Sequence, residues 1–168
     1  MTETAFAEAL GAFDAALATT TEVEGVWKAL QALADVVVGA KLFTIMKVDW
    51  ATERSGRVYT SHPDEYPVSG TKPMNRTHWF DTIHIQRKPF VANTIKDIAD
   101  VFPDHETIWQ LGCGSVLNWP VFIADQMVGT VNMLHDEHFY TPARVEAAKH
   151  LSLAAKAAFL AAEHLARK

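Results

Sequence analysis

The sequence has 168 residues, 49% of them hydrophobic and 21% charged, which fits one globular domain with a single core. A formal net charge of −5 without a lysine- and arginine-rich cluster argues against a nucleic-acid partner, and a single cysteine fits a reducing compartment. No run reaches the roughly 18 apolar residues of a membrane span and the N-terminus lacks a signal-peptide pattern, so we expect a soluble, cytoplasmic protein with no membrane partner.

Two helices are predicted before the first strand. Apolar residues at positions 6, 10, 13 and 17 predict the first helix, and a second apolar face between positions 23 and 37 predicts the next. Thr21 and Glu24 have the spacing of a capping box at the start of this second helix. Gly39 suits a left-handed residue just beyond its end.

A hairpin and a long loop are predicted next. Segments 42–50 and 57–62 are rich in strand-forming residues and predict a hairpin. Residues 63–76 contain three prolines and one glycine and predict a long loop, of a kind that often closes over a binding site. A short helix is predicted at 77–88 and a brief strand at 89–93.

The remaining residues predict a second hairpin and a final helix. Short helices are expected between positions 95 and 111, and segments 115–123 and 127–135 predict the hairpin around Ala124, Asp125 and Gln126. Thr141 and Pro142 are a preferred cap and first-turn pair for a last helix that runs almost to Lys168. This order predicts an α+β fold: an antiparallel sheet with the terminal helices on one face and a ligand pocket under loops and short helices on the other.

Four segments of the sequence follow one another in an order and spacing typical of a known domain family. They are GAKLFTIMKVDW at 39–50, SVLNWP at 115–120, Gly129 within MVGTVNML, and FYTPARVEAAKHLSLAAKAAF at 139–159. Together they resemble a GAF domain over residues 22–164. The resemblance implies a PAS-like sheet, a pocket between the sheet and the segment joining its middle strands, a homodimer formed through terminal helices, and a sensory role. We expect residues 1–20 to form a dimerisation or packing helix and residues 21–168 the GAF domain.

Three groups of GAF domains can be compared with this sequence residue by residue. Cyclic-nucleotide-binding members carry an Asn-Lys pair followed by Phe and an Asp-Glu pair, but here no Asn-Lys pair exists and Asp136 precedes Phe139. Bilin-binding members attach the pigment through a cysteine commonly followed by His, whereas Gly114 follows Cys113. Free methionine-R-sulfoxide reductases use a second, resolving cysteine, which this sequence lacks. We therefore expect neither a cyclic nucleotide nor a bilin, while a reductase resolved by an external thiol stays open.

Cys113 and the eight histidines give little sign of catalysis or metal binding. No Lys, Arg or His lies within seven residues of Cys113, so nothing nearby in sequence lowers its pKa, and we expect a structural thiol rather than a catalytic one. His135 and His138 are three residues apart just beyond a strand, without the helical frame of a HExxH zinc motif. We expect no metal.

Two asparagines occupy the middle of the otherwise apolar second hairpin. Asn118 shares a strand face with Val116, and Asn132 lies on the partner strand. A buried amide needs hydrogen-bond partners, which a ligand or neighbouring protein groups could supply. If the faces were reversed, the pocket would be lined by Leu117, Trp119, Met133 and His135.

The short helix and the long loop complete the candidate site. Trp79 and Phe80 would supply an aromatic wall, while His84 and Arg87 would favour an acidic ligand group. Tyr66, in the proline-rich loop, fits a lid better than a core. The candidate ligand-binding residues are Asn118, Asn132, Trp79, Phe80, His84, Arg87 and Tyr66. The expected ligand is a small organic molecule, anionic or aromatic.

Three functional classes fit this pattern. The first is a ligand sensor or regulatory module that acts through a dimer or a protein partner in trans. The second is a small stand-alone enzyme that acts on an organic or amino-acid-like substrate in the same pocket. The third is a dimerisation scaffold whose pocket is filled by side chains.

Overall fold

The computed structural model describes residues 2–68 and 70–168, so Met1 and Ser69, the latter in the predicted loop, lie outside the described residues. The chain divides into two compact units. One comprises the residues up to Gly39 together with Glu146–Lys168, and the other is Ala40–Val145. None of the helices in the described residues combines the length and apolar character that crossing a bilayer requires.

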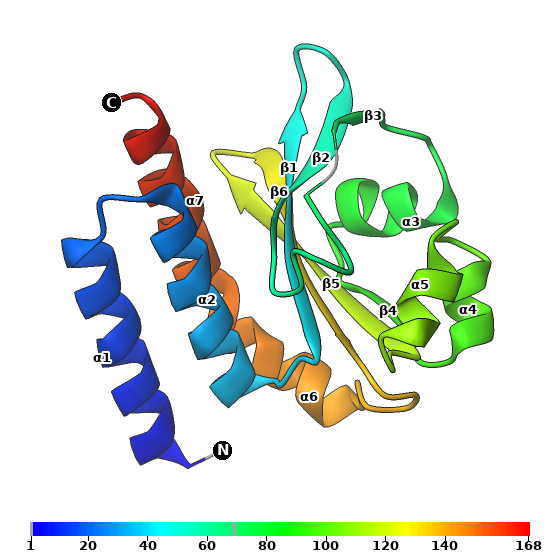
Figure 1. The fold of residues 1–168 in the computed structure, drawn as a ribbon, viewed down its shortest axis with the longest axis horizontal. Coiled ribbons are helices and arrows are strands. Elements are labelled where there is room, and N and C mark those ends of the chain that lie inside the picture. The colour runs from blue at the N-terminus through cyan, green and yellow to red at the C-terminus, as the bar shows by residue number, and fades with distance from the viewer. Residues whose placement is uncertain (1, 69) are drawn as a thin grey trace. The chain divides into compact units, whose positions relative to one another are not determined.

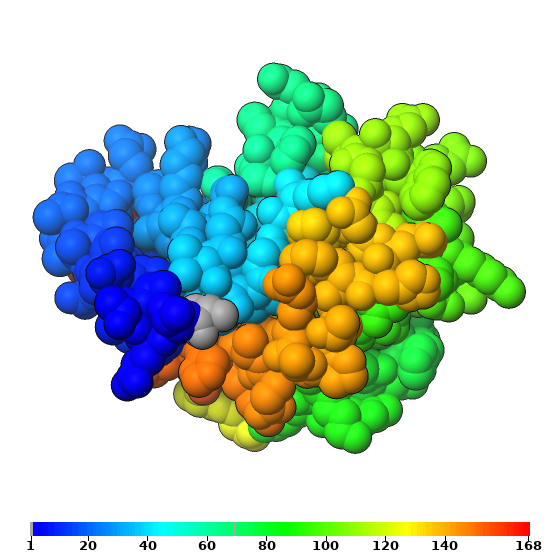
Figure 2. Space-filling model, turned by 90° about the horizontal axis from the view of Figure 1, so that it is seen from below, coloured from blue at the N-terminus to red at the C-terminus, as the bar shows by residue number. Residues whose placement is uncertain are grey.

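The first unit is helical. It contains α1 (Glu3–Thr19), α2 (Val23–Val37) and α7 (Ser152–Ala166), which lie side by side in Figure 1. Figure 2 shows α1 and α2 against each other in two shades of blue. Trp27 of α2 packs edge-on against Phe159 of α7 with ring centroids 5.1 Å apart. Both predicted N-terminal helices are therefore confirmed.

The ends of these helices differ in part from the sequence predictions. The predicted capping box is wrong, because α2 begins at Val23 behind Glu22 and receives no side-chain cap. The end of α2 is confirmed: Gly39 has a φ of 92° and its N–H donates to Ala34 O at 3.0 Å. The prediction of a single final helix is also wrong, since a 3-10 turn at Ala148–Leu151 separates α6 (Pro142–Ala147) from α7.

The second unit contains a six-stranded antiparallel sheet in the order β3-β2-β1-β6-β5-β4 (Figure 1). Its strands are β1 (Leu42–Asp49), β2 (Arg54–Thr60), β3 (Lys72–Pro73), β4 (Phe90–Ala92), β5 (Ser115–Ile123) and β6 (Gln126–His135). Both predicted hairpins are confirmed, although β2 begins three residues before its predicted start at 57. The turn of the second hairpin is two residues long, Ala124 and Asp125, with φ of 47° and 67°.

A bulge in the second hairpin decides which residues face each other. Next to the turn Ile123 pairs with Gln126, but the register shifts by one between Val121 and Phe122. Asn118 consequently pairs with Asn132. An unshifted ladder would set Asn118 opposite Val131 and send Asn132 to the other face.

Three short helices and a long loop belong to the same unit as the sheet. They are α3 (His78–Phe80), which continues into a π-helical turn at Asp81–Ile85, α4 (Ile95–Ala99) and α5 (His105–Gln110). Thr77 and Thr94 cap α3 and α4 by accepting backbone N–H groups. The helix predicted at 77–88 is confirmed but ends sooner, because Arg87 has a φ of 56°.

Candidate functional site

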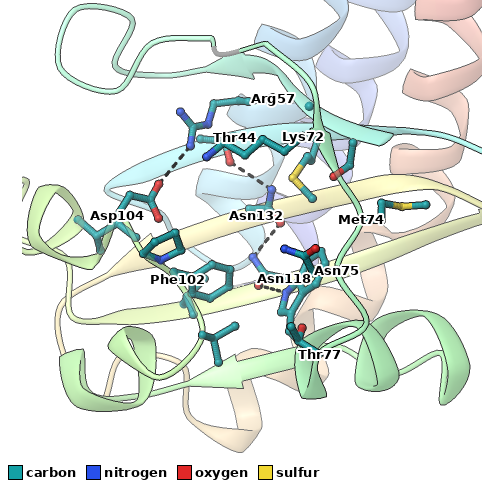
Figure 3. A pocket seen from close by; sticks show the side chains of 18 of the residues that line it. Thr44, Arg57, Lys72, Met74, Asn75, Thr77, Phe102, Asp104, Asn118 and Asn132 are labelled. Atoms are coloured by element: carbon teal, nitrogen blue, oxygen red, sulfur yellow. Dashed lines mark hydrogen bonds and ion pairs between the residues drawn. The ribbon is translucent and has the colours of Figure 1, made fainter. Parts of the chain in front are cut away.

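A cavity of about 280 Å³ lies within Ala40–Val145, against the sheet face that carries Asn118 and Asn132 (Figure 3). Strands β1, β2, β5 and β6 form one wall, and the 66–79 and 101–108 segments form the others. Leu117 and Met133, which point to the opposite face, are not among the lining residues. The cavity therefore lies on the strand face that the sequence predicted.

Four side chains form a hydrogen-bonded row across the floor of the cavity. Trp79 Nε1 donates to Asn118 Oδ1 at 2.9 Å, and Asn118 Nδ2 donates to Asn132 Oδ1 at 2.8 Å. Asn132 Nδ2 in turn donates to Thr44 Oγ1 at 3.2 Å. Figure 3 shows these hydrogen bonds crossing β5 and β6 from α3 to β1. The two buried amides thus find their partners within the protein.

The indole fixes the direction of the whole row. Because an indole N–H can only donate, Asn118 must turn its oxygen toward Trp79 and its amide nitrogen toward Asn132. The same reasoning turns the Asn132 nitrogen toward Thr44. The Thr44 hydroxyl accepts this bond and keeps its own hydrogen for another acceptor.

Charged side chains gather at one end of the cavity. Tyr66 donates its hydroxyl hydrogen to the Asp104 carboxylate, and Arg57 lies over the Tyr66 ring, 3.6 Å from its centroid. Burial, followed by the hydrogen bond to Asp104, raises the pKa of Tyr66. Tyr66 therefore stays protonated as a donor. Lys72 lines the same end of the cavity (Figure 3).

Besides the pairing of β3 with β2, side chains hold the loop between β2 and α3 down at three points. Arg57 Nη1 donates to Pro67 O at 2.8 Å, and Arg54 Nε donates to Thr71 Oγ1 at 2.8 Å. The Tyr66–Asp104 bond is the third. These anchors keep the loop over the cavity, whose lining it joins at Tyr66, Gly70, Lys72, Pro73, Met74 and Asn75.

The seven predicted binding residues divide into two groups. Asn118, Asn132, Trp79 and Tyr66 line the cavity, whereas Phe80, His84 and Arg87 do not. Whether the first four bind a ligand stays a prediction. The sequence predicted that Trp79, Phe80, His84 and Arg87 would reach the same pocket, but of these four only Trp79 is among the lining residues.

His84 packs against protein aromatic rings away from the cavity. Its ring centroid lies 4.5 Å from that of Trp50, 4.9 Å from that of Phe80 and 6.4 Å from that of Phe122. Burial, with smaller effects from nearby arginines, lowers its pKa. Arg87 pairs with Asp125 at the hairpin turn, with Nη1 2.7 Å from the carboxylate oxygen. His84 is thus surrounded by aromatic rings and Arg87 is held in an ion pair, both outside the cavity lining.

Cys113 is buried and is not among the lining residues, although it packs in one core cluster with the lining residues Tyr66 and Ile108. Burial raises the pKa of its thiol to about 11. Few thiolates would form near neutral pH, and the thiolate is the nucleophilic form. His135 stacks on Phe139 with ring centroids 3.4 Å apart, and within residues 2–68 and 70–168 no group of three His, Cys, Asp or Glu side chains is arranged to hold a metal ion.

Most of the lining residues were not singled out from the sequence, among them the polar side chains of Thr44, Arg57, Lys72 and Asp104. Thr44 follows from the register, since β1 pairs it with Asn132. Arg57 lies on the predicted strand 57–62, whereas Lys72 lies on the two-residue strand β3 inside the segment predicted as a loop. Asp104 carries no such pattern, because a loop brings it to Tyr66 across 38 positions of sequence.

No protein-family model and no curated protein matches this sequence. Solved structures match its fold. A GAF domain of a two-component sensor histidine kinase from Bacillus halodurans is 12% identical with a TM-score of 0.66, over 84% of this chain and 97% of that one. A GAF domain/HD domain protein from Geobacter sulfurreducens is 14% identical with a TM-score of 0.63, over 83% and 92%.

An enzyme shares the same architecture. Free methionine-R-sulfoxide reductase from Neisseria meningitidis, solved with its substrate, is 14% identical with a TM-score of 0.65, over 98% of this chain and 95% of that one. Identities this low show the fold alone. The chain therefore has the GAF fold, a PAS-like α+β architecture, and its ligand and activity must be argued from the cavity.

Proposed function

We propose that this protein is a ligand-binding GAF-fold module that takes up a small organic molecule in the cavity and transmits binding through a dimer or a protein partner. The observation that carries the proposal is the polar row on the cavity floor. A binding site uses a few placed polar groups within an apolar lining, and the row supplies such groups at the cavity although its amides also bond to one another.

The rest of the lining fits this role. Apolar side chains of Val101, Phe102, Ile108, Val116 and Leu134 surround the polar row. A cavity of about 280 Å³ is close to the lower end of the range for small-molecule sites, roughly 300 Å³. The likeness to a GAF domain of a sensor histidine kinase favours a regulatory role over a scaffold with a filled pocket.

An enzyme acting in the same cavity is the second candidate, and the likeness to the reductase is what favours it. Cysteine chemistry gains no support, because Cys113 is buried, is not among the lining residues, and has a thiol pKa raised to about 11. An enzyme here would need to work through polar groups such as Asp104 and Tyr66.

Native mass spectrometry of freshly purified protein tests the proposal. We expect a retained small molecule that is released on denaturation. Val116→Phe, which fills the cavity from β5, should abolish this retention while the far-ultraviolet circular dichroism stays unchanged. Addition of the isolated molecule to refolded protein should raise the melting temperature and return the molecule chemically unchanged. Conversion of the molecule into a product would favour the enzyme. The absence of both a retained molecule and a thermal shift would contradict both candidates.

A further inference from the structure

One end of the cavity carries more positive than negative charge. Arg57 and Lys72 line it together with a single carboxylate, Asp104 (Figure 3). The Arg57 side chain is 17% exposed, so water screens its charge only in part. A cavity with two cations and one anion favours an occupant that brings one negative charge.

Asp104 offsets part of this positive charge, because its carboxylate forms an ion pair with Arg57. Its carboxylate accepts the Tyr66 hydroxyl, and the Arg57 Nη2 atom stands 3.6 Å away, beyond good hydrogen-bonding distance. A guanidinium has five N–H donors, and one of those on Arg57 is used by Pro67 O. Lys72 makes no ion pair within the part of the chain that the structure describes.

The cavity floor also offers donors. The fixed direction of the row leaves the Thr44 hydroxyl hydrogen free to point to an acceptor, and each asparagine amide has a second N–H. Charged and neutral donors therefore face the same space. An ammonium group would meet other donors at these positions. A carboxylate would find hydrogen-bond donors both at the charged end and on the cavity floor.

We propose that the cavity selects a singly charged organic acid, whose carboxylate binds Arg57 and Lys72 and whose apolar body lies against Trp79 and Phe102. This inference rests on the proposed binding function and adds the chemical class of the ligand. It assigns the charge recognition to β2 and β3 rather than to His84 and Arg87. Asp104 then competes with the ligand carboxylate for Arg57.

Matched probes test the charge preference. Each probe pair consists of an arylalkanoic acid and the primary amide of the same skeleton, which has nearly the same shape without the charge. Binding is followed through the indole N–H resonance of Trp79, the end of the polar row. We expect the acids to bind about tenfold or more tightly than their amides, since hydrogen bonds to charged groups are the stronger ones.

Three variants locate the preference. Lys72→Gln, at an exposed side chain, should weaken acid binding severalfold and leave amide binding unchanged. Asp104→Asn should strengthen acid binding by removing the competing charge. Lys96→Gln on α4, outside the cavity, is the control and should change neither. Amides that bind as tightly as acids would overturn the acid proposal and leave the binding function standing. Failure of both members of every pair would overturn both.

Discussion

Asn118 holds the centre of the polar row, with a donor on one side and an acceptor on the other. Trp79 needs its oxygen and Asn132 needs its nitrogen. Asn118 is 3% exposed, so water cannot replace either bond without opening the cavity. One side chain thus supports both the packing of α3 on the sheet and the polarity of the cavity floor.

Replacing Asn118 with Ala should therefore reduce stability and binding together. The change leaves an indole N–H and an amide oxygen without partners, which costs about 1 to 3 kcal/mol for each group left buried. We expect a lower urea midpoint for unfolding and roughly tenfold weaker ligand binding. Asn75→Ala, at an exposed asparagine that lines the same cavity, should leave the midpoint unchanged. An unaltered midpoint in Asn118→Ala would show that the row contributes little.

Cys113 should behave as a structural thiol. A pKa raised from 9.0 to about 11 lowers the thiolate fraction near neutral pH by about a hundredfold, so iodoacetamide should modify the native protein far more slowly than the unfolded one. Because the folded pKa is the higher one, this group's contribution to stability is complete below about pH 9 and is lost as the pH rises toward 11.

The matching substitution is Cys113→Ala. It should cost about 1 to 2 kcal/mol of stability and leave ligand affinity intact. It should also flatten the loss of stability between pH 9 and pH 11, measured by urea unfolding at each pH. Rapid alkylation of the folded wild type would contradict this environment for the thiol.

At the level of elements, the two-residue turn between β5 and β6 holds an alanine in an unfavourable backbone conformation. Ala124 has a φ of 47°, in the left-handed region where a Cβ atom is unfavourable by roughly 1 kcal/mol. Ala124→Gly should therefore raise the free energy of unfolding by up to about 1 kcal/mol, as measured by urea denaturation. Ala7→Gly, at an exposed site within α1, should lower it by about 0.5 to 1 kcal/mol. If both substitutions changed the free energy of unfolding in the same direction, the left-handed conformation of Ala124 would be contradicted.

Sequence periodicity predicted the elements better than their details. Alternation was enough for both hairpins and for the strand face of Asn118, because side chains on a strand alternate whatever lies around it. It could not predict that Asn118 meets Asn132, since a bulge between Val121 and Phe122 creates that pairing. Nor could it place Arg87, because a helical wheel assumes a regular helix and a left-handed residue interrupts this one.

The charged end of the cavity could not be predicted from the sequence for a related reason. Arg57 and Asp104 lie 47 positions apart and meet only because the loop and the short helices fold back over the sheet. Local patterns contain no information about such a meeting. The composition of the 63–76 loop indicated a lid, but not which of its atoms would be anchored.

At the scale of the whole molecule, the helical unit presents apolar side chains to its surroundings. Leu153 and Leu160 on α7 are 79% and 56% exposed, seven residues apart and so on one side of the helix. Leu10 and Val36 are also exposed. We expect a dimer in light scattering at micromolar concentration, joined through these helices.

Charge placed on that surface should separate the subunits. Leu153→Glu combined with Leu160→Glu should give a monomer whose helix content is unchanged, because both side chains are exposed. Lys88→Glu, at an exposed side chain outside the helical unit, makes the same kind of charge change away from these helices and should stay dimeric. A wild type that is monomeric at high micromolar concentration would exclude this interface.

The three anchors of the loop over the cavity also bear on kinetics. A molecule held beneath it would be released more slowly wherever its exit requires the loop to open, because opening breaks the contacts of Arg54, Arg57 and Tyr66. Dialysis would then empty the cavity slowly even for a weakly bound occupant. Ligand-free protein for titration is best prepared by unfolding, desalting and refolding.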